Sequence, residues 1–203
     1  MKGISFPIKE SFYSIQGEGY YYGIAAYFIR FEGCNIKCDW CDTKESWKIE
    51  KKDFVPIHQI ITNISDYAVK NIVITGGEPM MWNLYPLTKI LKKKGYRIHV
   101  ETSGSYPIKE KYIDWITVSP KEIRPPLKEN YKKTNELKII ISNEKDFHFA
   151  EEQSIHVNTT NCFLFLQPEW NHLDKILPKI IFYIKKNPKW RISLQIHKIL
   201  KIP

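Results

Sequence analysis

Short apolar segments recur along the chain, and their pattern predicts the strands of a parallel sheet. They are rich in β-branched and aromatic residues and are largely apolar on both faces, as expected of strands buried on two sides. Six segments have this pattern: residues 25–31, 71–76, 97–102, 114–120, 136–142 and 162–168.

Amphipathic segments with helical spacing lie between several of these strands. Apolar residues return every three to four positions in residues 56–70, 82–95 and 171–187. Strands that alternate with helices form right-handed βα units around a parallel sheet. Because six strands are too few for a complete eight-stranded barrel, we expect an α/β fold with a partial, open βα barrel. No repeat or linker divides the chain, so residues 1–203 are expected to form a single domain.

The segments that follow the predicted strands are polar, Gly-rich or Cys-rich. The carboxyl ends of parallel strands meet at one edge of a sheet, which is where active sites form in such folds. These segments are the cysteine loop after residue 31, TGGEP (75–79), ETSG (101–104), VSPK (118–121) and LQPEW (166–170). We therefore expect one functional site at this edge.

Composition and charge exclude a few classes of protein. The chain is 43% apolar, enough for one well-packed core, and carries a net charge of +9. Most of the charge comes from lysines on predicted outer helix faces, without the interleaved arginines and aromatics of a nucleic-acid surface. The sequence has no run of eighteen apolar residues and no apolar leader at residues 1–10. We expect a cytoplasmic protein with no membrane span and no nucleic-acid partner.

Three of the four cysteines lie within eight positions, with the spacing C-x3-C-x2-C. Thiols stay reduced in the cytosol, so Cys34, Cys38 and Cys41 are candidate metal ligands. A structural zinc site takes four protein ligands, and His58 could complete one, although it lies at the start of a predicted helix. Cys162 begins a predicted strand and is expected to be a buried apolar residue. Three thiolates can also hold a [4Fe–4S] cluster and leave its fourth iron open.

The cysteine spacing beyond a first strand, with GGEP after the second, resembles the radical S-adenosylmethionine (SAM) superfamily. The resemblance implies that the amino and carboxylate groups of SAM bind the open iron. One-electron reduction would then release a 5′-deoxyadenosyl radical that takes hydrogen from the substrate. The cofactors carry this chemistry, while the protein orients them and excludes side reactions.

Further motifs are more specific. SIQGEG (14–19), Arg30, CDT (41–43) and the HK…IP terminus together resemble the 7-carboxy-7-deazaguanine synthase family over nearly the whole chain. The resemblance implies that 6-carboxy-5,6,7,8-tetrahydropterin is converted into 7-carboxy-7-deazaguanine with loss of ammonia, for queuosine-type 7-deazapurines. It also implies a recycled SAM, a required Mg²⁺, an electron donor such as flavodoxin and a homodimer.

The same resemblance assigns the site residues. It implies that residues 1–24 and 190–203 complete the substrate site and that Thr43 binds Mg²⁺. The implied substrate contacts are Ile15, Gln16, Gly17, Glu18, Arg30, Thr75, His197 and Pro203. The implied SAM contacts are Trp40, Cys41, Asp42, Gly76, Gly77, Glu78, Glu101, Ser103, Ser119, Pro120, Lys121, Gln167, Pro168, Glu169 and Trp170.

Residue chemistry alone leaves alternatives open. Arg30 ends an apolar run and needs an anion, which is either a substrate carboxylate or a structural partner such as Glu32 or Glu18. Thr43 by itself would more often be a turn or cap residue. The apolar segment 191–200 is strand-like and should dock on the protein, with Lys201 where family tails often carry glycine.

Two other functions remain compatible with the cysteine loop. One is a radical SAM activating enzyme that installs a glycyl radical on a partner protein. The other is a non-enzymatic, metal-stapled module that associates with RNA. The alignment of GGEP, ETSG and SPK at one edge has no role in the second case.

Overall fold

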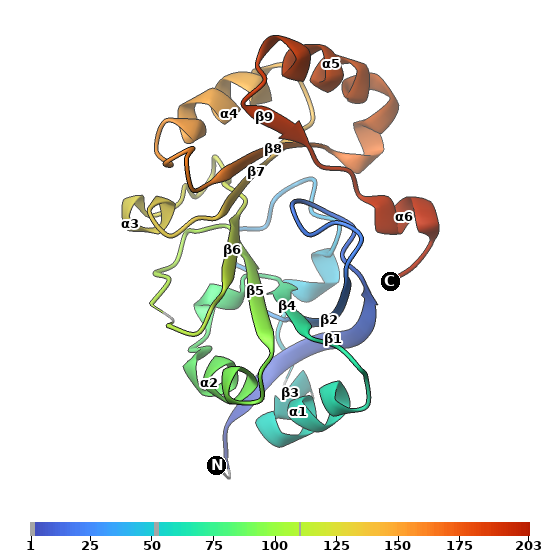
Figure 1. The fold of residues 1–203 in the computed structure, drawn as a ribbon, viewed down its shortest axis with the longest axis vertical. Helices are drawn as coiled ribbons and strands as arrows, with labels where there is room; N and C mark the ends of the chain where they lie inside the picture. Colours follow the sequence, from blue (N-terminus) through green and yellow to red (C-terminus); the bar gives the residue numbers. More distant parts are fainter. Residues whose placement is uncertain (1–2, 51–52, 110) are drawn as a thin grey trace.

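The computed structural model describes residues 3–50, 53–109 and 111–203, so residues 1 and 2 of the predicted substrate segment 1–24 lie outside the described residues (Figure 1). Nine strands are present in this part of the chain, and they form one sheet in the order β3-β1-β2-β4-β5-β6-β7-β8-β9. The strands are β1 (Ser5–Ile15), β2 (Ala25–Phe31), β3 (Phe54–Pro56), β4 (Asn71–Gly76), β5 (Arg97–Thr102), β6 (Trp115–Val118), β7 (Glu136–Ile141), β8 (Phe163–Pro168) and β9 (Trp190–Ile192).

The six predicted strands are confirmed as β2, β4, β5, β6, β7 and β8, and each neighbouring pair is parallel. The strand β9 adds a further parallel strand beside β8. At the opposite edge, β1 and β3 add antiparallel pairs. Since β3 and β9 are not paired with each other, the barrel is open, as predicted.

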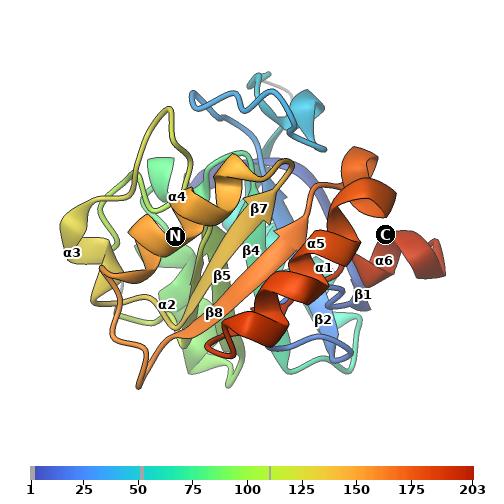
Figure 2. The same ribbon diagram turned by 90° about the horizontal axis from the view of Figure 1, so that it is seen from above.

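Helices cover the outer face of the curved sheet (Figures 1 and 2). The three predicted helices are present as α1 (Ile57–Ser65), α2 (Tyr85–Lys93) and α5 (Leu173–Lys186). The chain also forms α3 (Lys128–Tyr131), α4 (Lys145–Ser154) and α6 (Ile196–Leu200). Helix α2 packs on β5, α4 packs on β7, and α5 packs on β8 and β9. Within the described ranges, no helix combines the length and apolarity that crossing a bilayer requires.

The alternation of side chains along the strands separates the core from the functional face. In β4, Ile72 and Ile74 join the large apolar cluster beneath the helices. Val73 points to the other face, where it packs with Ala26 and Phe28. Thr75 continues the Val73 face, so the inner side becomes polar toward the strand end. The segments after the strand ends, including the cysteine loop, gather on one side of the molecule (Figure 2).

Candidate active site

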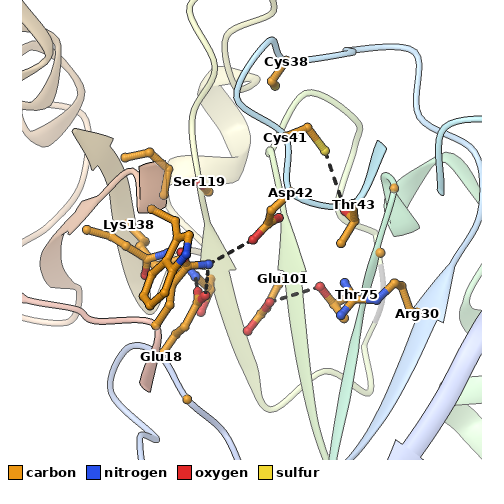
Figure 3. A pocket seen from close by; sticks show the side chains of 18 of the residues that line it. Glu18, Arg30, Cys38, Cys41, Asp42, Thr43, Thr75, Glu101, Ser119 and Lys138 are labelled. Atoms are coloured by element: carbon orange, nitrogen blue, oxygen red, sulfur yellow. Dashed lines mark hydrogen bonds and ion pairs between the residues drawn. The ribbon is translucent and has the colours of Figure 1, made fainter. Parts of the chain in front are cut away.

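A cavity of about 250 Å³ lies at the carboxyl ends of the parallel strands (Figure 3). Every predicted cluster, magnesium, SAM and substrate residue lines it except Pro120. Pro120 is buried in the turn between Ser119 and Lys121, which do line the cavity. The edge of the sheet therefore brings together residues that lie far apart in the sequence. The predicted site residues among them extend from Ile15 to Pro203, a separation of more than 180 positions.

The cysteine loop is closed on itself by main-chain hydrogen bonds. Gly33 N donates to Ser46 O at 2.8 Å and Cys34 N donates to Trp47 O at 3.2 Å, which brings the two ends of the loop together. Cys41 N donates to Cys38 O at 3.0 Å in a tight turn. The loop thus holds its three cysteines in one half of the cavity.

The three thiols are free, half-buried and close enough to affect one another. Burial raises the pKa of the Cys38 thiol, and the neighbouring thiols of Cys34 and Cys41 act in the same direction against the ammonium of Lys121. In the described part of the chain, no three Cys, His, Asp or Glu side chains converge on a point where they could hold one metal ion. Three thiolates can hold a [4Fe–4S] cluster when each of them binds a different iron.

The other candidate zinc ligands lie elsewhere. His58 is exposed on α1 and does not line the cavity. Cys162 is 4% exposed at the start of β8, the end opposite to the site, and burial raises its pKa to about 12. The prediction that Cys162 is a buried apolar residue agrees with this position.

The GGEP segment packs directly against the cysteine loop. Glu78 N donates to Gly33 O at 2.8 Å, and a Cβ on Gly77 would lie 2.4 Å from the same oxygen, so only glycine fits there. The buried Glu78 carboxylate accepts hydrogen bonds from Met80 N and from the Thr102 and Ser103 side chains. Since the Glu78 carboxylate is already hydrogen-bonded within the protein, the GGEP segment presents its main chain to the cavity.

Glu101 connects two predicted substrate residues. Gln16 Nε2 donates to Glu101 Oε1 at 3.0 Å, and Thr75 Oγ1 donates to Glu101 Oε2 at 3.1 Å. Desolvation acts to raise the pKa of Glu101, but Lys138, His99 and these hydrogen bonds outweigh it and lower that pKa. Glu101 is therefore an ionised group at the base of the cavity (Figure 3).

Arg30 has a different partner from those considered in the sequence. Its Nε donates to Glu10 Oε1 at 2.7 Å, and among the described residues no hydrogen bond or ion pair joins Arg30 to Glu32 or Glu18. Arg30 faces Glu10 in the antiparallel register of β1 and β2 and Thr75 in the parallel register of β2 and β4. Because Nε binds Glu10, the two terminal nitrogens are left for a ligand in the cavity.

Two further segments complete the side of the cavity nearest to the cysteines. Lys121 Nζ donates to Ser119 Oγ at 2.7 Å and lies 4.6 Å from the centre of the Trp40 ring. Burial lowers the pKa of Lys121 to about 8. In the second segment, Gln167 Oε1 accepts a hydrogen bond from Ser193 Oγ at 2.7 Å. This bond links β8 to the C-terminal tail, the residues that follow β9.

Thr43 makes few contacts through its side chain. Its hydroxyl lies 3.7 Å from Cys41 Sγ, and its carbonyl accepts from the Ser46 hydroxyl at 2.7 Å. The hydroxyl lines the cavity and is available to a further partner.

The C-terminal segment docks on the cavity, but only residues 191 and 192 of the expected strand 191–200 belong to β9, and residues 196–200 form the short helix α6. Ile196 N donates to Gly17 O at 3.1 Å, and a Cβ on Gly17 would lie 2.4 Å from His197 Nδ1. Ser14 Oγ donates to Pro203 O at 2.7 Å. Lys201 has φ 54° and ψ 41°, the left-handed conformation that glycine adopts most easily, which explains why glycine suits this position.

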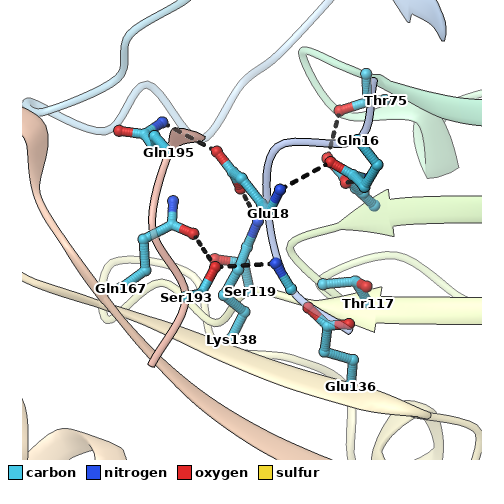
Figure 4. A network of polar contacts seen from close by, with 12 residues as sticks. Gln16, Glu18, Thr75, Thr117, Ser119, Glu136, Lys138, Gln167, Ser193 and Gln195 are labelled. Carbon is cyan, nitrogen blue, oxygen red and sulfur yellow. Dashed lines mark hydrogen bonds and ion pairs between the residues drawn. The ribbon is translucent and has the colours of Figure 1, made fainter. Parts of the chain in front are cut away.

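Sequence reasoning missed several polar residues of the cavity, above all Lys138, Gln195 and Lys198. Lys138 forms an ion pair with Glu18 (Figure 4). In the sequence, Lys138 could have been recognised as the single lysine of the largely apolar strand ELKIII. Gln195 and Lys198 lie in a short terminal segment that has no comparable pattern.

Comparisons with known proteins show which proteins this chain is similar to. The radical SAM superfamily model matches residues 28–148. A 7-carboxy-7-deazaguanine synthase from Flavobacterium psychrophilum is 49% identical over 202 residues, covering 100% of this chain and 95% of its own. The synthase from Synechocystis sp. is 42% identical over 199 residues, covering 98% of this chain and 94% of its own. The crystal structure of QueE from Escherichia coli aligns with a TM-score of 0.81 at 30% identity, covering 94% of this chain and 93% of that one.

Proposed function

The chain belongs to the 7-carboxy-7-deazaguanine synthase family of the radical SAM superfamily, and we propose that its cavity converts 6-carboxy-5,6,7,8-tetrahydropterin into 7-carboxy-7-deazaguanine. The enzyme is a carbon–nitrogen lyase. The product and one ammonia contain all the atoms of the pterin, so the conversion needs no net oxidant. The observation that carries the proposal is the single cavity that unites the cysteine loop, the strand ends and the tail.

Cys34, Cys38 and Cys41 would hold a [4Fe–4S] cluster, and SAM would bind the iron that no cysteine reaches. When bound, the reduced cluster and SAM supply the radical that takes a hydrogen atom from the substrate. The protein offers SAM the main chain of residues 76–78, because the Glu78 carboxylate is already hydrogen-bonded. Trp40, Lys121 and residues 167–170 line the same cavity.

The substrate would occupy the other half. The free terminal nitrogens of Arg30 can bind the substrate carboxylate in a bidentate manner. Glu18 and Gln16 can accept and donate hydrogen bonds along the amino-pyrimidine edge of the pterin. His197 and Pro203 would close the cavity over the substrate, because the tail is docked on Gly17 and Ser14.

The family resemblance also supports a bound Mg²⁺, an electron donor and a homodimer. The Thr43 hydroxyl would bind Mg²⁺ together with substrate oxygens and water, since Mg²⁺ prefers hard oxygen ligands and keeps several waters. A small one-electron donor such as a flavodoxin would reduce the cluster. We also propose that the enzyme acts in the cytoplasm as a homodimer.

The proposal is tested with the chain purified and reconstituted without oxygen, reduced, and mixed with SAM, Mg²⁺ and the carboxytetrahydropterin. We expect the 7-deazaguanine carboxylate in the mass spectrum, with SAM recovered. Reductive cleavage of SAM without pterin turnover would indicate a different radical substrate, such as a glycyl radical protein. Zinc in place of iron, with no SAM cleavage after reconstitution, would support a non-enzymatic module.

A further inference from the structure

Lys138 is a buried cation inside the substrate half of the cavity. It lies in the middle of β7, and its side chain is only 7% exposed. Its ammonium forms an ion pair with Glu18 and lies near the carboxylates of Glu101 and Glu136. A lysine is rarely buried unless it is paired, so its position requires these acidic neighbours.

The ion pair with Lys138 holds one carboxylate oxygen of Glu18, and hydrogen bonds hold the other oxygen and the main-chain amide (Figure 4). Glu18 Oε1 accepts from Gln195 Nε2 at 3.0 Å, while Oε2 faces Lys138. Glu18 N donates to Gln16 Oε1 at 3.1 Å, which turns the Gln16 amide toward Glu101. Each carboxylate oxygen has a second lone pair, so Glu18 can still accept hydrogen bonds from a ligand.

The charges around Lys138 are unequal, because one ammonium faces three carboxylates. Burial alone would lower the pKa of Lys138, but Glu18, Glu101 and Glu136 together raise it. Even beside this cation, burial raises the pKa of Glu136 to about 7. Without the ammonium, like charges in a poorly solvated site would force protons onto the carboxylates.

We propose that Lys138 is a positioning residue for substrate recognition, whose ammonium holds the Glu18 carboxylate in the orientation that accepts N–H groups from the substrate ring. The inference rests on the proposed function, because it takes Glu18 as a substrate contact. A reoriented Glu18 would no longer direct its acceptor oxygens toward the N–H donors of the substrate ring.

The experiment measures binding by calorimetry at neutral pH. It uses the unreduced holoenzyme with SAM and Mg²⁺, so that 6-carboxytetrahydropterin binds without turnover. Charged and titratable groups also face this pair from the elements packed around it. They are Asp42, His99, Glu101, Lys121, Glu136, His197 and Lys198. They are common to all variants, so differences from the wild type isolate Lys138 and Glu18.

Lys138→Met should weaken binding roughly tenfold or more near pH 7, the usual size of a lost charged hydrogen bond. Lys138→Arg keeps the charge and should change the Kd by less than about threefold, because its guanidinium can still pair with Glu18. In the Glu18→Gln background, Lys138→Met should add less than about a threefold loss, because residues that act together are not additive.

Wild-type affinity in Lys138→Met, a loss in Lys138→Arg as large as in Lys138→Met, or equal losses with and without Glu18→Gln would overturn the inference. If Lys138→Met loses its iron and its cooperative melting, Lys138→Met/Glu18→Gln should restore part of both, because it also removes one of the carboxylates that the lost ammonium leaves unpaired. Failure of that rescue would also contradict the inference. A wild-type enzyme that neither binds nor converts the pterin would instead refute the proposed function.

Discussion

Nζ of Lys198 lies 2.9 Å from Oδ2 of Asp42, an ion pair that joins helix α6 to the residue following Cys41. Gln195 Nε2 donates to the same Asp42 oxygen and to Glu18 Oε1, each at 3.0 Å. Desolvation acts to raise the pKa of Asp42, but the contacts with Lys198 and Gln195 lower it. The tail, the cysteine loop and the connection between β1 and β2 therefore meet at one point of the cavity.

Lys198→Met should loosen the tail and raise the KM for the pterin several-fold, while iron content and pterin-free SAM cleavage stay unchanged. The global free energy of unfolding should fall by less than about 1 kcal/mol, because the pair is partly exposed. Steady-state kinetics and iron analysis check this outcome. Lys185→Met, on an exposed position of α5, is the matched control. Equal effects of the two substitutions would contradict a role for the Lys198–Asp42 pair.

Lys201→Gly should stabilise the docked tail, because glycine adopts the left-handed conformation of residue 201 without a Cβ penalty. The Ile202 amide donates to His197 O at 3.1 Å, so its hydrogen exchange reports docking. We expect exchange at Ile202 to slow about fivefold, which corresponds to about 1 kcal/mol. Lys201→Ala keeps a Cβ and should exchange like the wild type. Faster exchange in Lys201→Gly than in Lys201→Ala would argue against strain at this position.

Thr43→Ala should raise the Mg²⁺ concentration needed for half-maximal turnover and leave the iron content intact. The Thr43 hydroxyl has only a 3.7 Å contact with Cys41 Sγ, so its loss disturbs the loop little. Thr43→Ser keeps a hydroxyl oxygen and should retain the wild-type Mg²⁺ requirement. Titration of Mg²⁺ at saturating SAM and pterin measures the effect. If Thr43→Ala shows unchanged Mg²⁺ dependence, this hydroxyl is not the ligand.

His99 should make the protein sensitive to mild acid. It is buried, its Nε2 lies 2.8 Å from Thr117 Oγ1, and burial lowers its pKa from 6.5 to about 4. As pH falls below 6.5, the unfolded chain takes up a proton that the folded protein does not, so stability present above pH 6.5 is lost toward pH 4.

The difference between the wild type and His99→Gln isolates this effect, since glutamine can keep a hydrogen bond to Thr117 without titrating. Relative to His99→Gln, the wild type should lose about 1.4 kcal/mol between pH 7.5 and 5.5. Urea unfolding at both pH values measures the change. Glu136, whose pKa is raised to about 7, contributes in the opposite direction but is the same in both proteins. Parallel pH profiles for the two proteins would show that burial does not lower the pKa of His99 in the folded protein.

The sequence was informative where a local pattern determines the structure. Buried parallel strands are apolar on both faces, so six of them could be located, and their carboxyl ends identified the edge that carries the cavity. The alternation of strand side chains then places Thr75, Glu101 and Lys138 on the inner face, where all three line the cavity.

The remaining features depend on contacts between distant segments. Glu10 is the partner of Arg30 because of the register of β1 and β2, which includes an irregularity between Ile8 and Glu10 that the sequence does not reveal. The segment 196–200 is helical, although its apolar pattern suggested a strand. Five residues are too few for a stable helix alone, so docking on Gly17 and Asp42 determines its conformation.

The most direct test of the three-cysteine site is electron–nuclear double resonance of the reduced, reconstituted protein with SAM labelled with ¹⁷O and ¹⁵N in its methionine part. Hyperfine coupling from both labels to the cluster is expected, because Cys34, Cys38 and Cys41 leave one iron for SAM. No coupling from either label, together with a fourth protein side chain on that iron, would contradict the proposed site.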